Sequence, residues 1–180
     1  MFFWIVVSFV VTQRIVELFI AKRNERWARQ LGALEYGGNH YKYIVLLHVS
    51  FFISVIIEYS INPIVSKGWY VFFFIFIFAQ ALRIWSLFSL GKHWNTKIIV
   101  IPNSEKVTKG PYRYFKHPNY LVVALELFTL PMIFGAYFTA ILFSFLNFVI
   151  IYFIRIPNEE RALQMLQTSP DPHPCRSGRP

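Results

Sequence analysis

The sequence predicts an all-α integral membrane protein with about five transmembrane helices. Hydrophobic residues make up 56% of the chain and aromatic residues 19%, including 20 phenylalanines. Several apolar runs are long enough to cross the hydrocarbon core of a bilayer, which is about 30 Å thick. A chain of 180 residues with these runs leaves no room for a second domain, so we treat residues 1–167 as one membrane domain.

The first three spans are predicted at residues 2–21, 41–61 and 70–90. Each run is long enough for one crossing. The first has no basic segment before it and no Ala-x-Ala cleavage site. We therefore expect it to be a retained span rather than a removable signal peptide.

The fourth and fifth spans come from one apolar run that is too long for a single crossing. Pro131 and Gly135 mark a turn within it, which divides the run into helices at 119–133 and 135–154. Pro118 is suited to the first turn of the fourth span. The prediction is thus a helical hairpin whose first helix is short.

The longest polar connection precedes this hairpin. Within it, "TKIIVIPNSEKVT" has an alternating apolar run, a turn and a shorter run, which predicts a small β-hairpin at the membrane interface. After the fifth span, "RIPNEERALQML" is predicted to form a short charged helix with Asn158 as its N-cap. Residues 168–180 are rich in proline, and we expect this tail to be disordered.

The basic residues predict the orientation of the chain. They concentrate in residues 22–42, in residues 92–116 and beyond residue 154, whereas Lys67 stands alone on the opposite side. Because short cytoplasmic loops retain Lys and Arg, we expect the N-terminus outside and the C-terminus in the cytoplasm of a multi-pass cell-membrane protein. Topology then explains most of the net charge of +9, so we expect membrane lipids, and no nucleic acid, as partners.

A single cysteine, Cys175, excludes an internal disulfide framework. No pair of Cys or His residues has the spacing of zinc ligands, so we expect no metal site.

Ionisable and polar residues within the predicted spans lie at one depth. Counted from the predicted cytoplasmic ends, the members of this layer sit roughly 10 Å below the border, with Glu17 slightly shallower; they are Arg14, Glu17, His48, Arg83, Glu126 and Asn147. Two interpretations remain open. Arg14 could pair with Glu17, and Arg83 with Glu126, to tie helices together, or the layer could form the floor of a polar cavity open to the cytoplasm.

Two motifs carry a family resemblance. "GPYRYFKHPNY", then an apolar hairpin, then "RIPNEERAL", resembles the isoprenylcysteine carboxyl methyltransferase family of integral membrane enzymes over roughly residues 80–165. The family pattern matches these positions: Gly110, Tyr112, Arg113, His117, Pro118, Tyr120, Arg155, Glu159 and Glu160. The resemblance implies that these residues enclose S-adenosyl-methionine at the cytoplasmic border, while a lipophilic acceptor enters from the bilayer.

A narrower resemblance concerns the acceptor. "QRIVELFIAKRNERW" and "SLGKHWNTKIIVIP" are similar to the bacterial branch that includes alkylpyrone O-methyltransferases, which implies a long-chain hydroxypyrone in place of an isoprenylcysteine carboxylate. The chain departs from the family pattern at Lys116, where an arginine is usual. It departs again after the paired glutamates, where a Pro-rich tail replaces an amphipathic helix.

The resemblance also implies roles for individual side chains. We expect His117 to contact the cofactor or the acceptor, or to serve as a general base if the acceptor arrives protonated; the alternative is a cap on the fourth span. Tyr112 and Tyr120 would pack against the adenine or the sulfonium, unless they are only interfacial anchors. Arg83 and Glu126 would line the acceptor side.

The second motif would bind the polar parts of the cofactor. Glu159 and Glu160 are expected to accept hydrogen bonds from ribose hydroxyls or the amino group, and Arg155 to bind the carboxylate; the alternative is a solvated helix end. Gly110 would allow a close backbone approach or a positive φ.

The resemblance therefore implies an S-adenosyl-methionine-dependent O-methyltransferase acting on a lipophilic acceptor. A NADPH-dependent membrane reductase of related architecture and a non-catalytic membrane protein are the alternatives. The sequence does not predict an oligomeric state.

Overall fold

A computed structural model describes residues 1–102, 104 and 107–168. The five predicted spans form the helices α1 (Phe2–Gln30), α2 (Gly38–Ile61), α3 (Trp69–Leu90), α4 (Pro118–Ile133) and α5 (Tyr137–Val149). Four helical stretches are long and apolar enough to cross a membrane, and α4, with 16 residues, is shorter. The all-α integral membrane class and the short fourth helix are thus confirmed.

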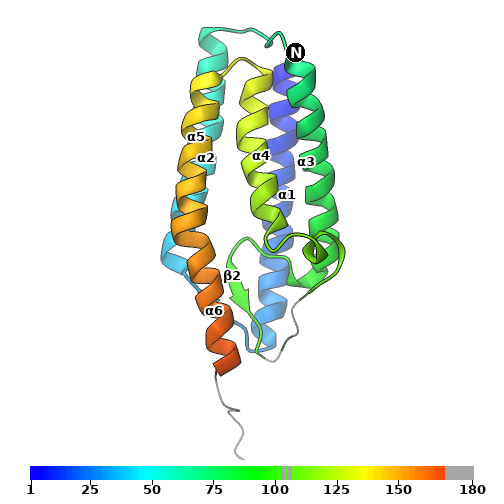
Figure 1. Cartoon of the computed structure of the whole chain (residues 1–180), viewed down its shortest axis with the longest axis vertical. Helices are drawn as coiled ribbons and strands as arrows, with labels where there is room; N and C mark the ends of the chain where they lie inside the picture. The colour runs from blue at the N-terminus through cyan, green and yellow to red at the C-terminus, as the bar shows by residue number, and fades with distance from the viewer. Residues whose placement is uncertain (103, 105–106, 169–180) are drawn as a thin grey trace, which may run out of the picture.

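The five helices run side by side as a bundle, with α3 against α4, α4 against α5 and α5 against α2 (Figure 1). Aromatic rings fill the core at the end that carries the N-terminus. Phe3 stacks on Tyr59 with ring centroids 3.8 Å apart and meets Phe134 edge-on at 4.9 Å. Many large apolar side chains point outward from the bundle, as expected where lipid rather than water surrounds the helices.

The turn between α4 and α5 is fixed by two contacts. Gly135 has a φ of +66°, and a Cβ atom there would lie 2.9 Å from Ile64, so only glycine fits without strain. The Glu58 carboxylate, at the end of α2, accepts hydrogen bonds from the backbone N–H groups of Phe138 and Thr139 at 3.0 and 2.9 Å. These N–H groups have no acceptor within α5, so Glu58 supplies one. The hairpin therefore returns the chain to the other end of the bundle.

The predicted β-hairpin within the loop before α4 is wrong. β2 (Ile98–Val100) pairs antiparallel with β1 (Leu34–Tyr36), which lies between α1 and α2. The connecting loops are held together because Asn24 of α1 donates to the carbonyls of Gly91 at 3.1 Å and Trp94 at 2.8 Å. This docking brings Ile98–Val100 next to the first polar loop instead of leaving it to fold back on itself. Residues 103 and 105 of the expected turn, and residue 106 of the run after it, lie outside the described residues.

Two of the helices continue past the C-terminal ends of their predicted spans. α1 continues to Gln30, supported by the Glu25 and Arg29 pair one turn apart at 2.7 Å. After α5 the helix continues through a π-helical segment, η3 (Ile150–Arg155), into α6 (Ile156–Thr168). Asn158 is therefore inside a continuous helix, where its side chain donates to the Ile154 carbonyl at 2.6 Å, and its prediction as an N-cap is wrong. The predicted disordered tail, with Cys175, falls on residues 169–180, outside the described residues.

A buried cluster of four charges joins α1, α3 and α4. Arg83 donates to both carboxylate oxygens of Glu126, at 2.8 and 2.5 Å, and pairs with Glu17 at 3.1 Å. Arg14 pairs with Glu17 at 2.8 Å and with Glu126. Arg83, Glu126 and Glu17 are only 2%, 4% and 5% exposed. Two positive and two negative groups balance each other, as burial in an apolar bundle requires.

The remaining members of the polar layer form no ion pair with any residue that the structure describes. His48 of α2 lies near this cluster, and its Nδ1 is 2.8 Å from the Ile44 carbonyl of its own helix. Asn147 is buried on α5. The structure thus confirms the helix-tying interpretation of the layer. The hollow that adjoins the cluster, between α1 and α3, has a volume of about 320 Å³ and mainly apolar walls.

Removing one charge from the cluster is expected to destabilise the fold. Glu126→Met or Arg83→Met leaves an uncompensated buried charge, which costs about 3–5 kcal/mol in free energy of unfolding. The double variant keeps the Arg14 and Glu17 pair, so its cost should be clearly smaller than the sum of the two single costs. Reversible unfolding in mixed micelles, followed by circular dichroism, measures all three. Additive costs would show that the two side chains do not pair.

Candidate functional site

The first motif begins with a tight contact against the end of α3. Gly110 opens a short 3₁₀ helix, η2 (Gly110–Arg113), with a φ of +61°. A Cβ atom on Gly110 would lie 2.0 Å from Ser89 Oγ and 3.0 Å from Trp85 Nε1. Both reasons predicted for a glycine, close approach and positive φ, apply at this position.

The two motifs meet at four side chains. The Tyr120 hydroxyl donates to the Glu159 carboxylate, and Arg155 Nε donates to the same hydroxyl at 3.2 Å. His117 Nδ1 lies 3.6 Å from Glu159 Oε1. The rings of His117 and Tyr120 stack with centroids 5.1 Å apart. The α4–α5 hairpin thus brings together residues that are far apart in the sequence.

Local helix geometry aims each of these side chains. His117 is the N-cap residue of α4 and Tyr120 lies three positions later, so both occupy one face. Arg155 ends the π-helical segment, and Glu159 lies one turn further along α6. A π segment holds more residues per turn than an α-helix and shifts the face that follows it, a feature frequent at functional sites. Arg155 is directed inward and only 7% exposed.

Arg155 has a further partner that sequence reasoning missed. Its Nη2 donates to the backbone carbonyl of Thr96 at 2.7 Å. The Thr96 hydroxyl lies 3.2 Å from the Tyr41 hydroxyl at the start of α2. Neither residue belongs to the two motifs, and a backbone acceptor has no signal in the side-chain pattern.

His117 has one ring nitrogen without a partner. Its Nε2 is buried and makes no hydrogen bond to any residue that the structure describes. The His117 side chain does not cap α4 either. Because buried polar atoms in native proteins are nearly always bonded, Nε2 is a point at which a bound ligand would complete the site.

Tyr112 contributes a neutral phenol near the Glu159 carboxylate. Burial, and secondarily the nearby Glu159 carboxylate, raise the pKa of Tyr112 above its ordinary value. Its hydroxyl therefore keeps its proton at neutral pH and is a hydrogen-bond donor.

The other predicted site residues lie around or away from this centre. Lys116 and Glu160 form a second, exposed ion pair between the two motifs. Arg113 is exposed, and Pro118 is buried at the first turn of α4. Arg83 and Glu126 belong to the buried charge cluster, where every guanidinium nitrogen of Arg83 is bonded to a carboxylate. Their place on the acceptor side stays a prediction.

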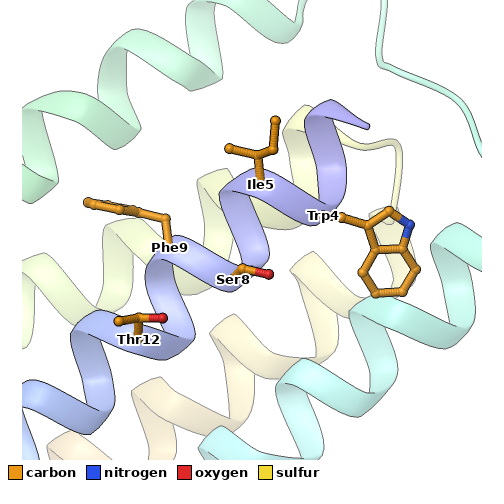
Figure 2. A pocket seen from close by; sticks show the side chains of 5 residues that line it. All are labelled: Trp4, Ile5, Ser8, Phe9 and Thr12. Carbon is orange, nitrogen blue, oxygen red and sulfur yellow. The ribbon is translucent and has the colours of Figure 1, made fainter.

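A further hollow lies on the opposite half of the bundle. It has a volume of about 520 Å³ and is lined by Trp4, Ile5, Ser8, Phe9 and Thr12. Figure 2 shows these five side chains along the first turns of α1. The loop before α4 and the β1–β2 pair lie at the other end of the molecule (Figure 1), so this hollow is separate from the four-residue centre.

The convergence of the two motifs agrees with comparisons to known proteins. A sequence model of the isoprenylcysteine carboxyl methyltransferase (ICMT) family matches residues 71–165, which include both motifs. The chain belongs to the ICMT family. It is thus a multi-pass member of a family of membrane methyltransferases whose general methyl donor is S-adenosyl-methionine.

Two relatives extend over nearly the whole chain. An uncharacterized protein, YpbQ, of Bacillus subtilis (strain 168) is 42% identical over 163 residues, which cover 90% of this chain and 96% of that protein. An uncharacterized protein of Haemophilus influenzae (strain ATCC 51907 / DSM 11121 / KW20 / Rd) is 28% identical, covering 87% of this chain and 92% of its own length. No solved structure matches the chain.

The polar side chains that meet here have charges and shapes that suit S-adenosyl-methionine, the general methyl donor of the family. A guanidinium at Arg155 suits the carboxylate of an amino acid, and a carboxylate at Glu159 suits ribose hydroxyls or an ammonium group. The faces of Tyr120 and His117 are suited to a sulfonium or a purine. The unpartnered Nε2 of His117 leaves one hydrogen bond for the ligand.

Enlarging Gly110 is expected to displace the first motif. Gly110→Ala places a methyl group against Ser89 in addition to the cost of a positive φ, which is about 1–2 kcal/mol. Gly32→Ala is the matched control, because Gly32 also has a positive φ but faces open space. Thermal unfolding should show a larger loss for Gly110→Ala, partly restored by Ser89→Gly. Equal losses for the two alanine variants would contradict the close contact.

Proposed function

We propose that the protein is an S-adenosyl-methionine-dependent O-methyltransferase that acts at the cytoplasmic face of the cell membrane on a lipophilic acceptor. The observation that carries the proposal is the meeting of His117, Tyr120, Arg155 and Glu159, with His117 Nε2 buried and without a hydrogen bond to any described residue. Membership of a methyltransferase family supplies the reaction class.

Each residue of the centre has a definite task in this proposal. Arg155 binds the donor's carboxylate, Glu159 holds its hydroxyl or ammonium groups, and His117 contributes Nε2 as a donor or acceptor. Tyr120 links Arg155 to Glu159 and so keeps both charges in place. S-adenosyl-methionine supplies, when bound, a methyl group activated by a positively charged sulfur.

The acceptor is proposed to be anionic before it reacts. A carboxylate of the isoprenylcysteine type is ionised at neutral pH, and the enol of an alkylpyrone-type hydroxyl is acidic enough to be ionised as well. The protein then needs to orient the oxygen and exclude water rather than to remove a proton with a strong base. If the acceptor arrives protonated, His117 is the base within the centre.

The direct test combines binding and product identification. Purified protein is incubated with methyl-labelled S-adenosyl-methionine and a lipid extract of its host, and labelled products are identified by mass spectrometry. We expect a labelled methyl ether or methyl ester. Absence of S-adenosyl-methionine binding would contradict the proposal, and binding of NADPH instead would favour the reductase alternative.

Neutralising Glu159 is expected to weaken donor binding. Glu159→Gln removes charge-assisted hydrogen bonds, each worth about 1.5–3 kcal/mol, so the dissociation constant should rise roughly tenfold to a hundredfold. Arg161→Gln changes an exposed charge on the same helix and should leave the constant near that of the parent. Calorimetric titration measures both. An unchanged constant for Glu159→Gln would remove this residue from the site.

A further inference from the structure

Arg155 donates to the carbonyl of a peptide group whose C=O and N–H are both hydrogen-bonded. The peptide bond between Thr96 and Lys97 carries the Thr96 carbonyl, which accepts from Arg155 Nη2 at 2.7 Å. The same peptide carries the Lys97 N–H group, which donates to Asn95 Oδ1 at 3.1 Å. Because a peptide group is planar, holding its N–H also fixes the direction of its carbonyl.

Asn95 is itself anchored to α1. Its Nδ2 donates to the Ala21 carbonyl at 3.3 Å, so one side chain bonds both α1 and the Thr96–Lys97 peptide. An asparagine that accepts from the N–H group two residues later forms an Asx-turn, which sets the local backbone direction. Asn95 thereby determines where the Thr96 carbonyl points.

The side chain of Lys97 holds the residue that follows Thr96 in place. Its Nζ pairs with Glu25 of α1 at 3.1 Å and with Glu35 of β1 at 3.2 Å. Partial burial lowers the pKa of Lys97, but the hydrogen bonds to these two carboxylates outweigh it and raise the pKa above its ordinary value. The ammonium group therefore stays charged at neutral pH. Arg29 binds the same two carboxylates from the exposed side.

We propose that Asn95 and Lys97 are positioning residues that aim the Thr96 carbonyl at Arg155 and so hold its guanidinium ready for the carboxylate of the methyl donor. The binding part of this inference rests on the proposed function. The anchors in α1 and β1 precede residues 71–165, the segment matched by the family. The first part of the chain is therefore a component of the donor site, in addition to forming membrane spans.

The test separates the roles of the Oδ1 acceptor and the Nδ2 donor of Asn95. Asn95→Asp keeps the acceptor for the Lys97 N–H but loses the bond to Ala21, whereas Asn95→Ala loses both. If the residue positions the peptide, affinity for S-adenosyl-methionine in calorimetry falls roughly tenfold in Asn95→Ala and clearly less in Asn95→Asp, which keeps the Asx-turn but loses the tie to α1. Equal losses in both variants would show that only the tie to α1 matters, and unchanged affinity in both would show no role. Either result overturns the inference.

A second pair of variants covers the case in which Asn95→Ala does not fold. Lys97→Met and Arg29→Met each remove one cation from the same two carboxylates, but only Lys97 adjoins the aimed peptide. We expect weakened donor binding in Lys97→Met and near-parental binding in Arg29→Met. Identical effects would overturn the positioning role of Lys97.

Hydrogen exchange without any ligand separates this inference from the proposed function. When the Thr96 carbonyl is no longer held toward Arg155, amide exchange in residues 150–162 should rise in Asn95→Ala and Lys97→Met, rise less in Asn95→Asp, and stay at the parent level in Arg29→Met. If the parent protein binds no S-adenosyl-methionine, the proposed function fails while this exchange pattern still supports the positioning role. If the donor binds and exchange is the same in all variants, the positioning role fails alone.

Discussion

Three buried charged side chains and the partly exposed Arg14 must neutralise one another among apolar helices, and this constraint sets how α1, α3 and α4 pack. Moving α4 by one turn would separate Glu126 from both arginines. From this fixed level, Ser89 lies six residues further along α3 and Tyr120 six residues earlier on α4, each about 9 Å away. The charge cluster therefore sets the heights at which Gly110 meets α3 and Tyr120 meets Glu159.

The centre that follows from this packing combines distant parts of the chain. Glu58 and Gly135 fix the far end of the α4–α5 hairpin, and the π-helical segment turns Arg155 toward Tyr120 at the near end. The loop before α4 and the β1–β2 pair complete the surroundings. ICMT-family membership assigns a methyltransferase class to the chain, and in our proposal Arg155 and Glu159 of this centre bind the oppositely charged groups of the family's methyl donor.

Much of the architecture could be predicted because apolar runs in a membrane protein have few alternatives to helices. The Pro131 and Gly135 turn, the polar layer and the two motifs were all visible in the sequence. The pairing of β1 with β2 was not, since three-residue strands from distant loops leave no periodic pattern. The hairpin prediction failed because it sought a partner within the same loop. The π segment and the Thr96 carbonyl were missed because neither depends on a distinctive residue type.

The mutual hydrogen bonds of Tyr120, Arg155 and Glu159 affect the thermodynamics of ligand recognition. A ligand group that displaces one of these hydrogen bonds exchanges an existing protein contact for a new one, so the net free energy gained from that exchange is small. His117 Nε2 is different, because it has no hydrogen bond to any described residue. A ligand atom that bonds to it removes the cost of burying an unsatisfied polar atom and breaks no existing hydrogen bond. Among ligands that carry the same charges, selectivity should then depend on whether one polar atom reaches this nitrogen.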